Sequence, residues 1–567
     1  MKHNMKTINK FLALAALVGL SSCASSFLEK EPHGSTLTQA QYERLDNTLE
    51  GSMRGIYAML YTKTSTDHDE FGKRSIDMYG DLLCGDMALT SYTYGWFYTD
   101  ERGMTYTART GTVWSSYYKM LHNVNMVIKS VNEQTQIIQK VAEFGLPNAY
   151  NSSRAELYVI NATAEKNDTL CTYTETEASI ANYYAQALTM RGYVLSNLIN
   201  LYCPTSAEIA SGGSTLEQTL SFPLYNENNM DQTQPLAKLS EVYTQLESDL
   251  TTAINYFDAF DDIISRPSKL TADISVARGI LAYSYLNKAN PNAASTGDAY
   301  RQAYTNALNY AKDVIEKGGY VIIPNANVYT TGFNDVNNAS WIWGQEVTTE
   351  TATGLASFFG QVDIHSYSYA WAGDTKVIDQ RLYDSIPSFD ARKGWFNDGS
   401  ANATFRLCPD RKFFSAKSPT STKSEDIDRE WLSDNVYMRI ESMYLIAAEA
   451  SYRLGNYDDA KNYLCAITDQ RVSTAEGASA AYSNFVSSLN STNLLRTIEY
   501  NWRVELWGEG YGLMTFRRLA PETTAVPGYE RRRGSNHSSE SGAEIKPNDD
   551  KYKFVMPSSE SSYNPNL

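Results

Sequence analysis

YMRIESMYLIAAEASYRLGNYDDAKNYLCAI, residues 437–467, carries two helical patterns on either side of a turn. Small and apolar residues recur three or four positions apart on each side: Tyr444, Ala447 and Ala448 in the first half, and Ala460, Leu464 and Ile467 in the second. The sequence GNYDDA at 455–460 ends one helix and starts the next. Small residues where helices cross allow close approach. The segment therefore predicts a tetratricopeptide-like helix pair.

The same pattern extends through most of the chain. A second pair is expected at 276–286 and 307–315, separated by the polar insertion ANPNAASTGD, and weaker helical segments lie at 114–131, 178–201 and 239–257. A lone helix pair covers only one of its faces, so these segments need one another. We therefore expect a mostly α fold, a scaffold of helix pairs packed as one compact body.

Residues 320–435 break the helical pattern. Trp341 and Trp343 alternate around Ile342, which predicts a short buried strand. Long polar loops follow it, and loops of this length inside a compact domain are usually functional or disordered. The sequence thus predicts a loop-rich second layer with a few short strands.

Aromatic residues are crowded in two of the non-helical segments. SYTYGWFYTD, residues 91–100, holds five rings in ten residues around Gly95. The second cluster comprises Phe358, Phe359, Tyr367, Tyr369 and Trp371. Tyr and Trp combine an apolar ring with a polar group and suit half-exposed surfaces. An aromatic edge strand or a buried loop is the alternative interpretation of the first cluster.

The first residues indicate export. A basic start precedes the apolar run FLALAALVGL at 11–20, which is too short for a membrane span, and LSSC ends at Cys23. We interpret residues 1–22 as a lipoprotein signal peptide and Cys23 as the lipidated anchor. Ordinary signal cleavage beside an unrelated cysteine is the alternative.

Charge and cysteine content argue against a nucleic-acid partner, a disulfide framework and a zinc site. The net charge of −16 repels phosphate backbones, so we expect no nucleic-acid partner and favour a neutral ligand. After Cys23 the remaining cysteines are scattered without a C-x-x-C motif, which argues against a disulfide framework and a zinc site. They are predicted to be mostly buried free thiols.

Catalytic motifs are missing from the sequence. It has no H-E-x-x-H, G-x-S-x-G or G-x-x-x-x-G-K, and we predict no catalytic residue, cofactor or metal. The acidic stretches 67–70 and 426–428 lack the spacing of a calcium loop and are interpreted as turns. Glu505 is expected to cap a helix or to pair with Arg503 or Arg517 rather than act as a catalytic acid. A carboxylate pair of a glycoside hydrolase stays possible among the 65 acidic residues.

Several segments match one family in order along the chain. They are Cys23 with FLEKEP (27–32), WSSYYKMLHNVN (114–125), LESDLTTA (246–253), residues 439–450, LRTIEYNWRVELWGEGYGLMTFRR (495–518), FVMP (554–557) and Asn564-Pro565. From Cys23 onward the chain resembles the RagB/SusD family of nutrient-binding outer-membrane lipoproteins. Two departures, Cys203 where the family often has glycine and the polar stretch 531–550, concern loops.

The resemblance implies an architecture and a setting. It implies an N-terminal SusD-like region at 23–235 and a C-terminal RagB/SusD region at 236–567, packed together on a tetratricopeptide scaffold. It also implies a lipid-anchored protein of the outer membrane, facing the exterior, that covers a SusC-like TonB-dependent transporter. Most ligands of the family are glycans, and some are peptides.

The resemblance further places a ligand surface in the two aromatic segments. We expect stacking on a sugar from Tyr94, Trp96, Tyr98, Tyr369 and Trp371, and hydroxyl contacts from Asp86, Asp100, Arg102 and Asp374. The predicted function is capture of an oligosaccharide or polysaccharide and its delivery to the transporter. A peptide-binding member of the family, a surface glycoside hydrolase and a scaffold that binds only proteins are the alternatives.

Overall fold

The structure is a computed structural model, and it describes residues 39–98, 107–162, 167–264, 266, 268–291, 298–414, 431–525, 530–547 and 549–567. The chain divides into two compact units, Met1–Asn47 and Thr48–Leu567. Helix α2 (Gln39–Ala58) contains the last residues of the first unit and the first residues of the second. The rest of this description concerns the second unit.

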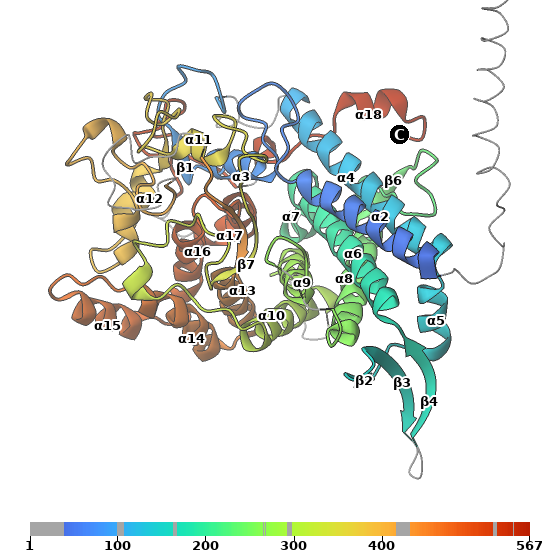
Figure 1. Cartoon of the computed structure of the whole chain (residues 1–567). Helices are drawn as coiled ribbons and strands as arrows, with labels where there is room; N and C mark the ends of the chain where they lie inside the picture. Colours follow the sequence, from blue (N-terminus) through green and yellow to red (C-terminus); the bar gives the residue numbers. More distant parts are fainter. Residues whose placement is uncertain are drawn as a thin grey trace, which may run out of the picture. The chain divides into compact units, whose positions relative to one another are not determined.

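The scaffold is a succession of helices in which each packs against the next. These are α4 (Thr107–Gln134), α6 (Glu175–Tyr202), α8 (Leu239–Phe260), α9 (Ile274–Lys288), α10 (Ala299–Lys317), α13 (Ile440–Leu454) and α14 (Tyr457–Thr468). Figure 1 shows them side by side from α4 across to α14. The expected segments at 114–131, 178–201, 239–257, 276–286 and 307–315 each fall within one of these helices, so the mostly α scaffold is confirmed.

The helix pair at 437–467 forms as predicted, with one difference at its start. Gly455 ends α13 in the left-handed region at φ 88, and its N–H donates to the carbonyls of Ser451 and Tyr452. A residue with positive φ is the usual end of a helix, and glycine adopts it at least cost. Residues 437–439, however, belong to strand β9 (Asn435–Arg439), which pairs with β7 (Trp341–Gln345).

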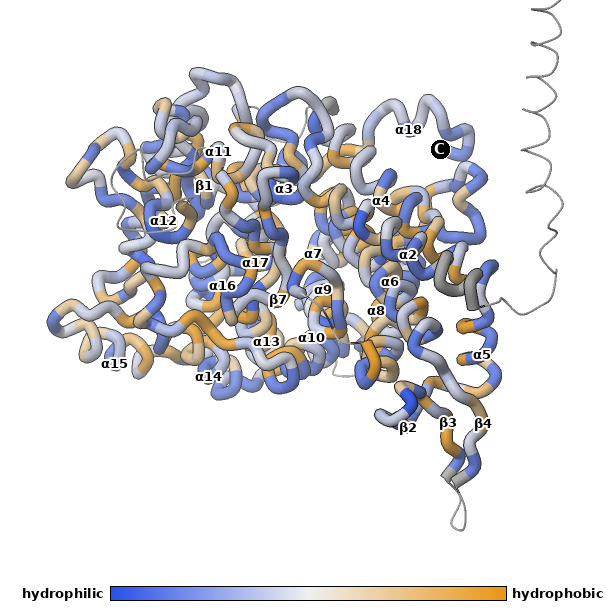
Figure 2. Tube along the Cα trace, in the orientation of Figure 1, coloured by the Kyte–Doolittle hydropathy of each residue, from blue (hydrophilic) through white to orange (hydrophobic). Residues whose placement is uncertain are grey.

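Long helices approach closely where the sequence supplies glycine. A Cβ added to Gly192 of α6 would lie 2.6 Å from Cγ of Leu250 in α8. Beside this contact, the buried Arg191 donates to both carboxylate oxygens of Asp249, each at 2.7 Å. Thr174 and Glu177 form a capping box at the start of α6. Along the helices, hydrophobic and hydrophilic residues are interspersed, as expected for helices that pack on one face (Figure 2).

Shorter helices complete the unit. They include α3 (Lys73–Leu83), α5 (Ile137–Phe144), α7 (Ser206–Ser211), α11 (Phe358–Val362), α12 (Gln380–Ser385), α15 (Ala478–Ser488), α16 (Leu494–Glu505), α17 (Gly512–Thr523) and α18 (Ser558–Tyr563). In the part of the chain that the structure describes, no helix is long and apolar enough to cross a bilayer.

The strands are short and form separate small sheets. The sheets pair β1 (Met87–Leu89) with β8 (Lys376–Ile378), β2 (Ala149–Asn151) and β4 (Asn167–Tyr173) with β3 (Glu156–Ala162), β5 (Leu220–Pro223) with β6 (Leu236–Lys238), and β7 with β9. Trp341 and Trp343 in β7 are at most 1% exposed, which confirms the expected buried strand. The cysteines after Cys23 are free, and only Cys465 is not fully buried.

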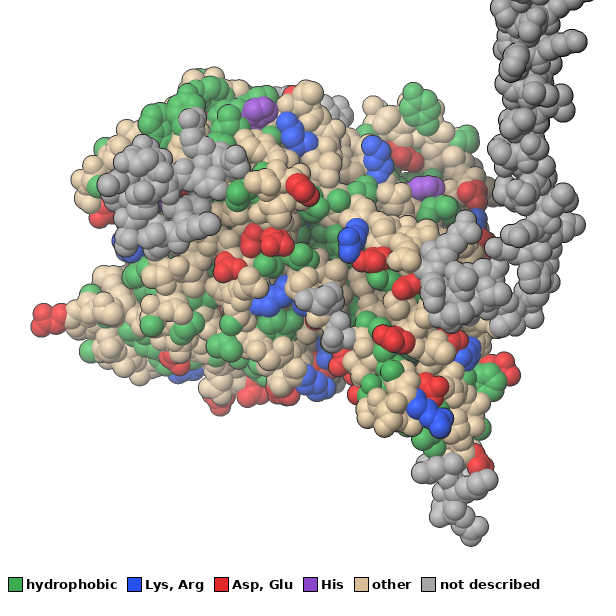
Figure 3. Space-filling view, viewed as in Figure 1, with side chains coloured by type: hydrophobic (Ala, Val, Ile, Leu, Met, Phe, Trp, Pro, Cys, Tyr) green, Lys and Arg blue, Asp and Glu red, His purple; other side chains and the backbone are tan. Residues whose placement is uncertain are grey.

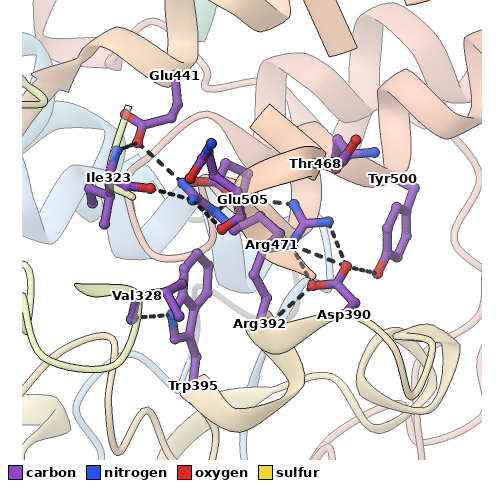
Figure 4. A network of polar contacts seen from close by, with 12 residues as sticks. Ile323, Val328, Asp390, Arg392, Trp395, Glu441, Thr468, Arg471, Tyr500 and Glu505 are labelled. Carbon is purple, nitrogen blue, oxygen red and sulfur yellow. Dashed lines mark hydrogen bonds and ion pairs between the residues drawn. The ribbon is translucent and has the colours of Figure 1, made fainter. Parts of the chain in front are cut away.

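A buried ion network connects the helices to the loop layer (Figure 4). Arg471 contacts both oxygens of Glu505 in α16 at 2.8 and 3.0 Å, Arg439 lies 2.8 Å from Oε1, and Arg392 lies 3.2 Å from Oε2. Burial alone would raise the pKa of Glu505, but the charges of Arg471, Arg439 and Arg392 hold it well below its usual range. Three cations therefore keep this buried carboxylate ionised.

The expected partners of Glu505 were wrong. Arg503 pairs instead with Asp86, and Arg517 pairs with Glu208. Helical spacing favoured neighbours in sequence, whereas the tertiary fold brings Arg439 from β9 and Arg392 from the loop layer to the carboxylate. The pairing role itself stands, and it leaves Glu505 without access to a substrate, since it is 0% exposed.

Candidate ligand-binding site

Two short strands position both aromatic segments at one end of a small sheet. β1 and β8 run antiparallel, with Leu89 opposite Lys376, and the N–H of Thr90 donates to the carbonyl of Thr375 at 3.1 Å. In an antiparallel pair the end of one strand lies beside the start of the other. The loop after β1 and the loop before β8 therefore leave the sheet side by side.

Rings from the two loops are in direct contact. The ring of Tyr94 meets the ring of Tyr369 edge-on, with centroids 5.1 Å apart at 74°. His68, from a third segment, stacks on Trp96 with centroids 5.3 Å apart at 9°, and its Nδ1 lies 2.8 Å from Oη of Tyr369. These four residues make one continuous cluster from three stretches of sequence.

The same two loops contribute two further pairs of rings in contact. Tyr92 and Tyr98 lie 4.7 Å apart, and Tyr367 and Trp371 lie 5.0 Å apart. We call the whole set the aromatic surface: His68, Tyr92, Tyr94, Trp96, Tyr98, Tyr367, Tyr369 and Trp371. In Figure 3 hydrophobic side chains and a histidine gather at the top, over the region of β1 and α11.

Much of the aromatic surface is open to solvent. Tyr92, Tyr94, Tyr367 and Trp371 are 46–56% exposed, whereas Tyr369 is 8% exposed and supports the others from below. Large exposed rings in one patch are unusual on a protein that binds nothing. Exposure of this kind makes the patch the candidate ligand surface.

One ring of the first segment turns inward and anchors the loop. Phe97 is fully buried, with its ring 5.4 Å from that of Tyr79, and its N–H donates to Oδ2 of Asp69 at 3.2 Å. Gly95 and Phe97 both have positive φ, at 80 and 62. This twist places Phe97 inside while its neighbours stay outside, which explains why the rings do not simply alternate.

Buried charges support the aromatic surface from beneath. Arg109 pairs with Asp69 and, at 2.9 Å, with Glu70. Nζ of Lys376 lies 3.0 Å from Asp374 and 5.5 Å from the ring centre of Tyr369. Burial raises the pKa of Asp374 and lowers the pKa of Lys376, while each charge stabilises the other.

The predicted polar contacts are placed differently from the rings. Asp86 is 1% exposed and pairs with Arg503 at 2.8 Å and with Arg531. Asp374 is 0% exposed. Both carboxylates are therefore engaged inside the fold, which favours a structural role for them. The predicted contacts Asp100 and Arg102, the anchor Cys23 and the signal peptide at 1–22 lie outside the described residues.

The second aromatic segment divides into an inner and an outer part. Phe358 and Phe359 are at most 2% exposed within α11, so they belong to the core. Tyr367 and Trp371 remain on the surface. Sequence reasoning did not select His68, Tyr92 or Tyr367 as site residues. Tyr92 shares the alternation of Tyr94 and Trp96, but for His68 only the folded contact reveals the role.

The surroundings of His68 favour the neutral form of its imidazole. Burial and the charge of Lys63 lower its pKa, against the opposite effect of Asp67 and Asp69. A neutral imidazole stacked on indole adds to a surface with little charge. Among the described residues, no group of three or more His, Cys, Asp or Glu side chains is arranged to hold a metal ion.

Profiles of known families match nearly the whole chain. The profile of the SusD family matches residues 281–567, and a profile described as starch-binding and associating with the outer membrane matches residues 26–281. No curated protein sequence matches. The predicted boundary between 235 and 236 stays a prediction.

Solved structures show the same fold. The chain is similar to a SusD-like carbohydrate binding protein from Bacteroides vulgatus, with a TM-score of 0.63 and 21% identity over 92% of this chain and 97% of that one. It is also similar to a SusD superfamily protein from Bacteroides thetaiotaomicron, with a TM-score of 0.62 and 17% identity over 92% and 98% of the two chains.

Proposed function

Because the chain belongs to the SusD family, we propose that it is a cell-surface lipoprotein that binds an oligosaccharide on its aromatic surface. The observation that carries the proposal is the joining of two exposed ring segments through Tyr94 and Tyr369. The matching profile described as starch-binding, and the similar fold of a protein named as carbohydrate binding, point the same way.

The chemistry of the surface suits a sugar chain. Sugar rings present faces of C–H bonds that pack against aromatic rings, while their hydroxyl groups reach polar groups nearby. Tyr94 and Trp371 offer exposed faces, and tyrosine hydroxyls such as that of Tyr92 add donors and acceptors. We propose that rings from both loops contact the same sugar chain.

A shallow site of this kind binds weakly. Few ligand atoms are buried on an open surface, so we expect dissociation constants on the order of micromolar to millimolar. Weak binding allows release to a partner. We propose that the partner is a SusC-like TonB-dependent transporter and that Cys23 carries the lipid that holds the protein at the outer membrane, on its exterior side.

Binding without catalysis is the proposed activity. The acids beneath the rings are engaged in ion pairs, Asp69 and Glu70 with Arg109 and Asp374 with Lys376. A glycoside hydrolase needs one carboxyl group as an acid and a second as a nucleophile or base, both facing the substrate. These paired, buried groups do not offer that arrangement.

Affinity electrophoresis tests the proposal. The wild type and Trp371→Ala are run in gels that contain one polysaccharide each, including starch, a β-glucan, a xylan and a mannan. We expect one glycan to retard the wild type and to retard Trp371→Ala much less. Tyr563→Ala is the matched control, because Tyr563 is 84% exposed in α18 and is not part of the aromatic surface.

The same experiment separates the alternatives. Product release from the retarding glycan would favour the hydrolase. Retardation by no glycan, together with Trp371-dependent binding of a peptide pool, would replace the proposal with the peptide-binding alternative.

A further inference from the structure

A second hollow of the protein shares no residue with the aromatic surface. A cavity of about 570 Å³ is lined by residues of α2, α6 and the end of β7, together with Ile264, Ser268, Leu270 and Thr271. Its size falls within the range of small-molecule sites, about 300–1,000 Å³. The proposed function does not use this cavity.

The lining combines rings with amides. Four tyrosines line the cavity, Tyr57, Tyr61, Tyr183 and Tyr437. Three amide side chains also line it, Asn182, Gln186 and Gln345. Part of the wall is a fixed hydrogen-bonded chain. Oη of Tyr57 donates to Oε1 of Gln186 at 2.9 Å, and Nε2 of Gln186 donates to Oδ1 of Asn182 at 2.5 Å.

Gln345 offers an amide donor that the protein leaves unused. The residue is 6% exposed, and its Oε1 accepts from Asn435 at 3.0 Å and from Tyr437 at 3.1 Å. Its Nε2 has no acceptor among the described residues. This N–H group remains able to donate to an oxygen of a ligand bound in the cavity.

The charges at the cavity select against anions. Glu50 and Glu346 both line it, and Arg54 is already paired with Glu50. The chain as a whole carries a net charge of −16. An anionic ligand would therefore meet repulsion, and a purely apolar ligand would leave the amide of Gln345 unsatisfied.

We propose that this cavity is a second binding site, which takes a small neutral saccharide of one or two sugar units. Tyr61 and the other tyrosine rings of the cavity pack against the C–H face of the sugar. Gln345 and Asn182 form hydrogen bonds with its hydroxyl groups. The site is independent of the aromatic surface. A variant that lacks the rings of the aromatic surface should still bind in the cavity, and a variant with a blocked cavity should still bind at the aromatic surface.

Saturation-transfer difference NMR on the full chain tests this site. The probes are maltose, cellobiose, lactose and the methyl glycosides of glucose, galactose and mannose. Binding is measured in the double variant Tyr94→Ala/Trp371→Ala, which removes exposed rings of the aromatic surface. We expect at least one probe to keep its signal in that variant.

Two cavity variants then locate the signal. Ser179→Trp places an indole at a cavity-lining position of α6, and Tyr61→Ala removes one ring, so each should weaken the retained signal at least 5-fold. Ser240→Trp in α8 is the matched control, because Ser240 has intermediate exposure like Ser179 and does not line the cavity. Near-ultraviolet circular dichroism checks that each variant is folded.

Three results would overturn the proposal. The first is loss of every probe signal in the aromatic-surface variant. The second is a signal that survives Ser179→Trp and Tyr61→Ala in folded proteins. The third is binding of a short peptide in the cavity, with none of the sugar probes binding there. In none of these cases does the aromatic surface lose its own support, which rests on the affinity gels.

Discussion

Tyr94 and Tyr369 meet edge-on with ring centroids 5.1 Å apart, although they come from loops in different halves of the chain. The pairing of β1 with β8 brings these loops together, and His68 joins them from a third segment. The contact turns two separate aromatic clusters into one surface. The proposed capture of a sugar chain depends on this joining.

Phe97 and Trp371 should respond in opposite ways to truncation. Phe97 is fully buried, so Phe97→Ala is expected to lower the free energy of unfolding by about 3–5 kcal/mol. Trp371 is 47% exposed, so Trp371→Ala is expected to change it by about 0.5 kcal/mol or less. Urea denaturation followed by circular dichroism measures both. Equal losses would show that the two rings are packed alike.

Gly192 and Gly51 form a matched pair of helical glycines. A Cβ at Gly192 would lie 2.6 Å from Cγ of Leu250, so Gly192→Ala should destabilise the protein by about 1–3 kcal/mol through overpacking. A Cβ at Gly51 of α2 meets nothing within 4 Å, so Gly51→Ala should stabilise by about 0.5–1 kcal/mol. Melting temperatures compare the two. A stabilising Gly192→Ala would contradict the close approach of α6 and α8.

Glu505 should matter far more than an exposed acid. Glu505→Gln leaves Arg471, Arg439 and Arg392 without their shared buried carboxylate, and we expect a loss of about 3–5 kcal/mol of stability. Glu522 pairs with Arg453 but is 40% exposed at its side chain, so Glu522→Gln should cost about 1 kcal/mol or less. Chemical denaturation of the wild type and both variants measures the two changes in the free energy of unfolding. A stable Glu505→Gln protein would show that the network carries no net stability.

His68 should titrate below a free histidine. Burial and Lys63 lower its pKa in the folded protein, so the native state binds fewer protons than the unfolded chain. Its contribution to stability is then fully present above about pH 6.5 and falls as the pH drops through the folded pKa. An NMR titration of the imidazole, assigned with His68→Gln, measures the midpoint. A midpoint above about 6.5 would mean that Asp67 and Asp69 outweigh burial.

Periodicity predicted the scaffold because helices that pack in series need an apolar face every turn. Residues 437–467 therefore revealed the helix pair, and the alternation of Trp341 and Trp343 revealed a buried strand. Those features are local, and sequence spacing is enough to detect them.

The parts that could not be predicted depend on contacts between distant segments. Asp86 and Asp374 are polar residues beside aromatic loops, and only the fold shows that Arg503 and Lys376 hold them inside. Likewise, Glu505 lies near Arg503 in sequence, but its partners come from other elements. His68 belongs to an acidic stretch that gave no sign of a stacking partner.

The most direct test of the aromatic surface is isothermal titration calorimetry with one oligosaccharide and variants in each of the two loops. The ligand is the one selected by the affinity gels, titrated into the wild type, Tyr94→Ala, Trp371→Ala and the control Tyr563→Ala. Removal of one stacking ring should cost about 1–2 kcal/mol, so each of the two loop variants should bind about 5- to 30-fold more weakly. The control should bind like the wild type. Unchanged affinity in either loop variant would contradict a single capture surface built from both loops.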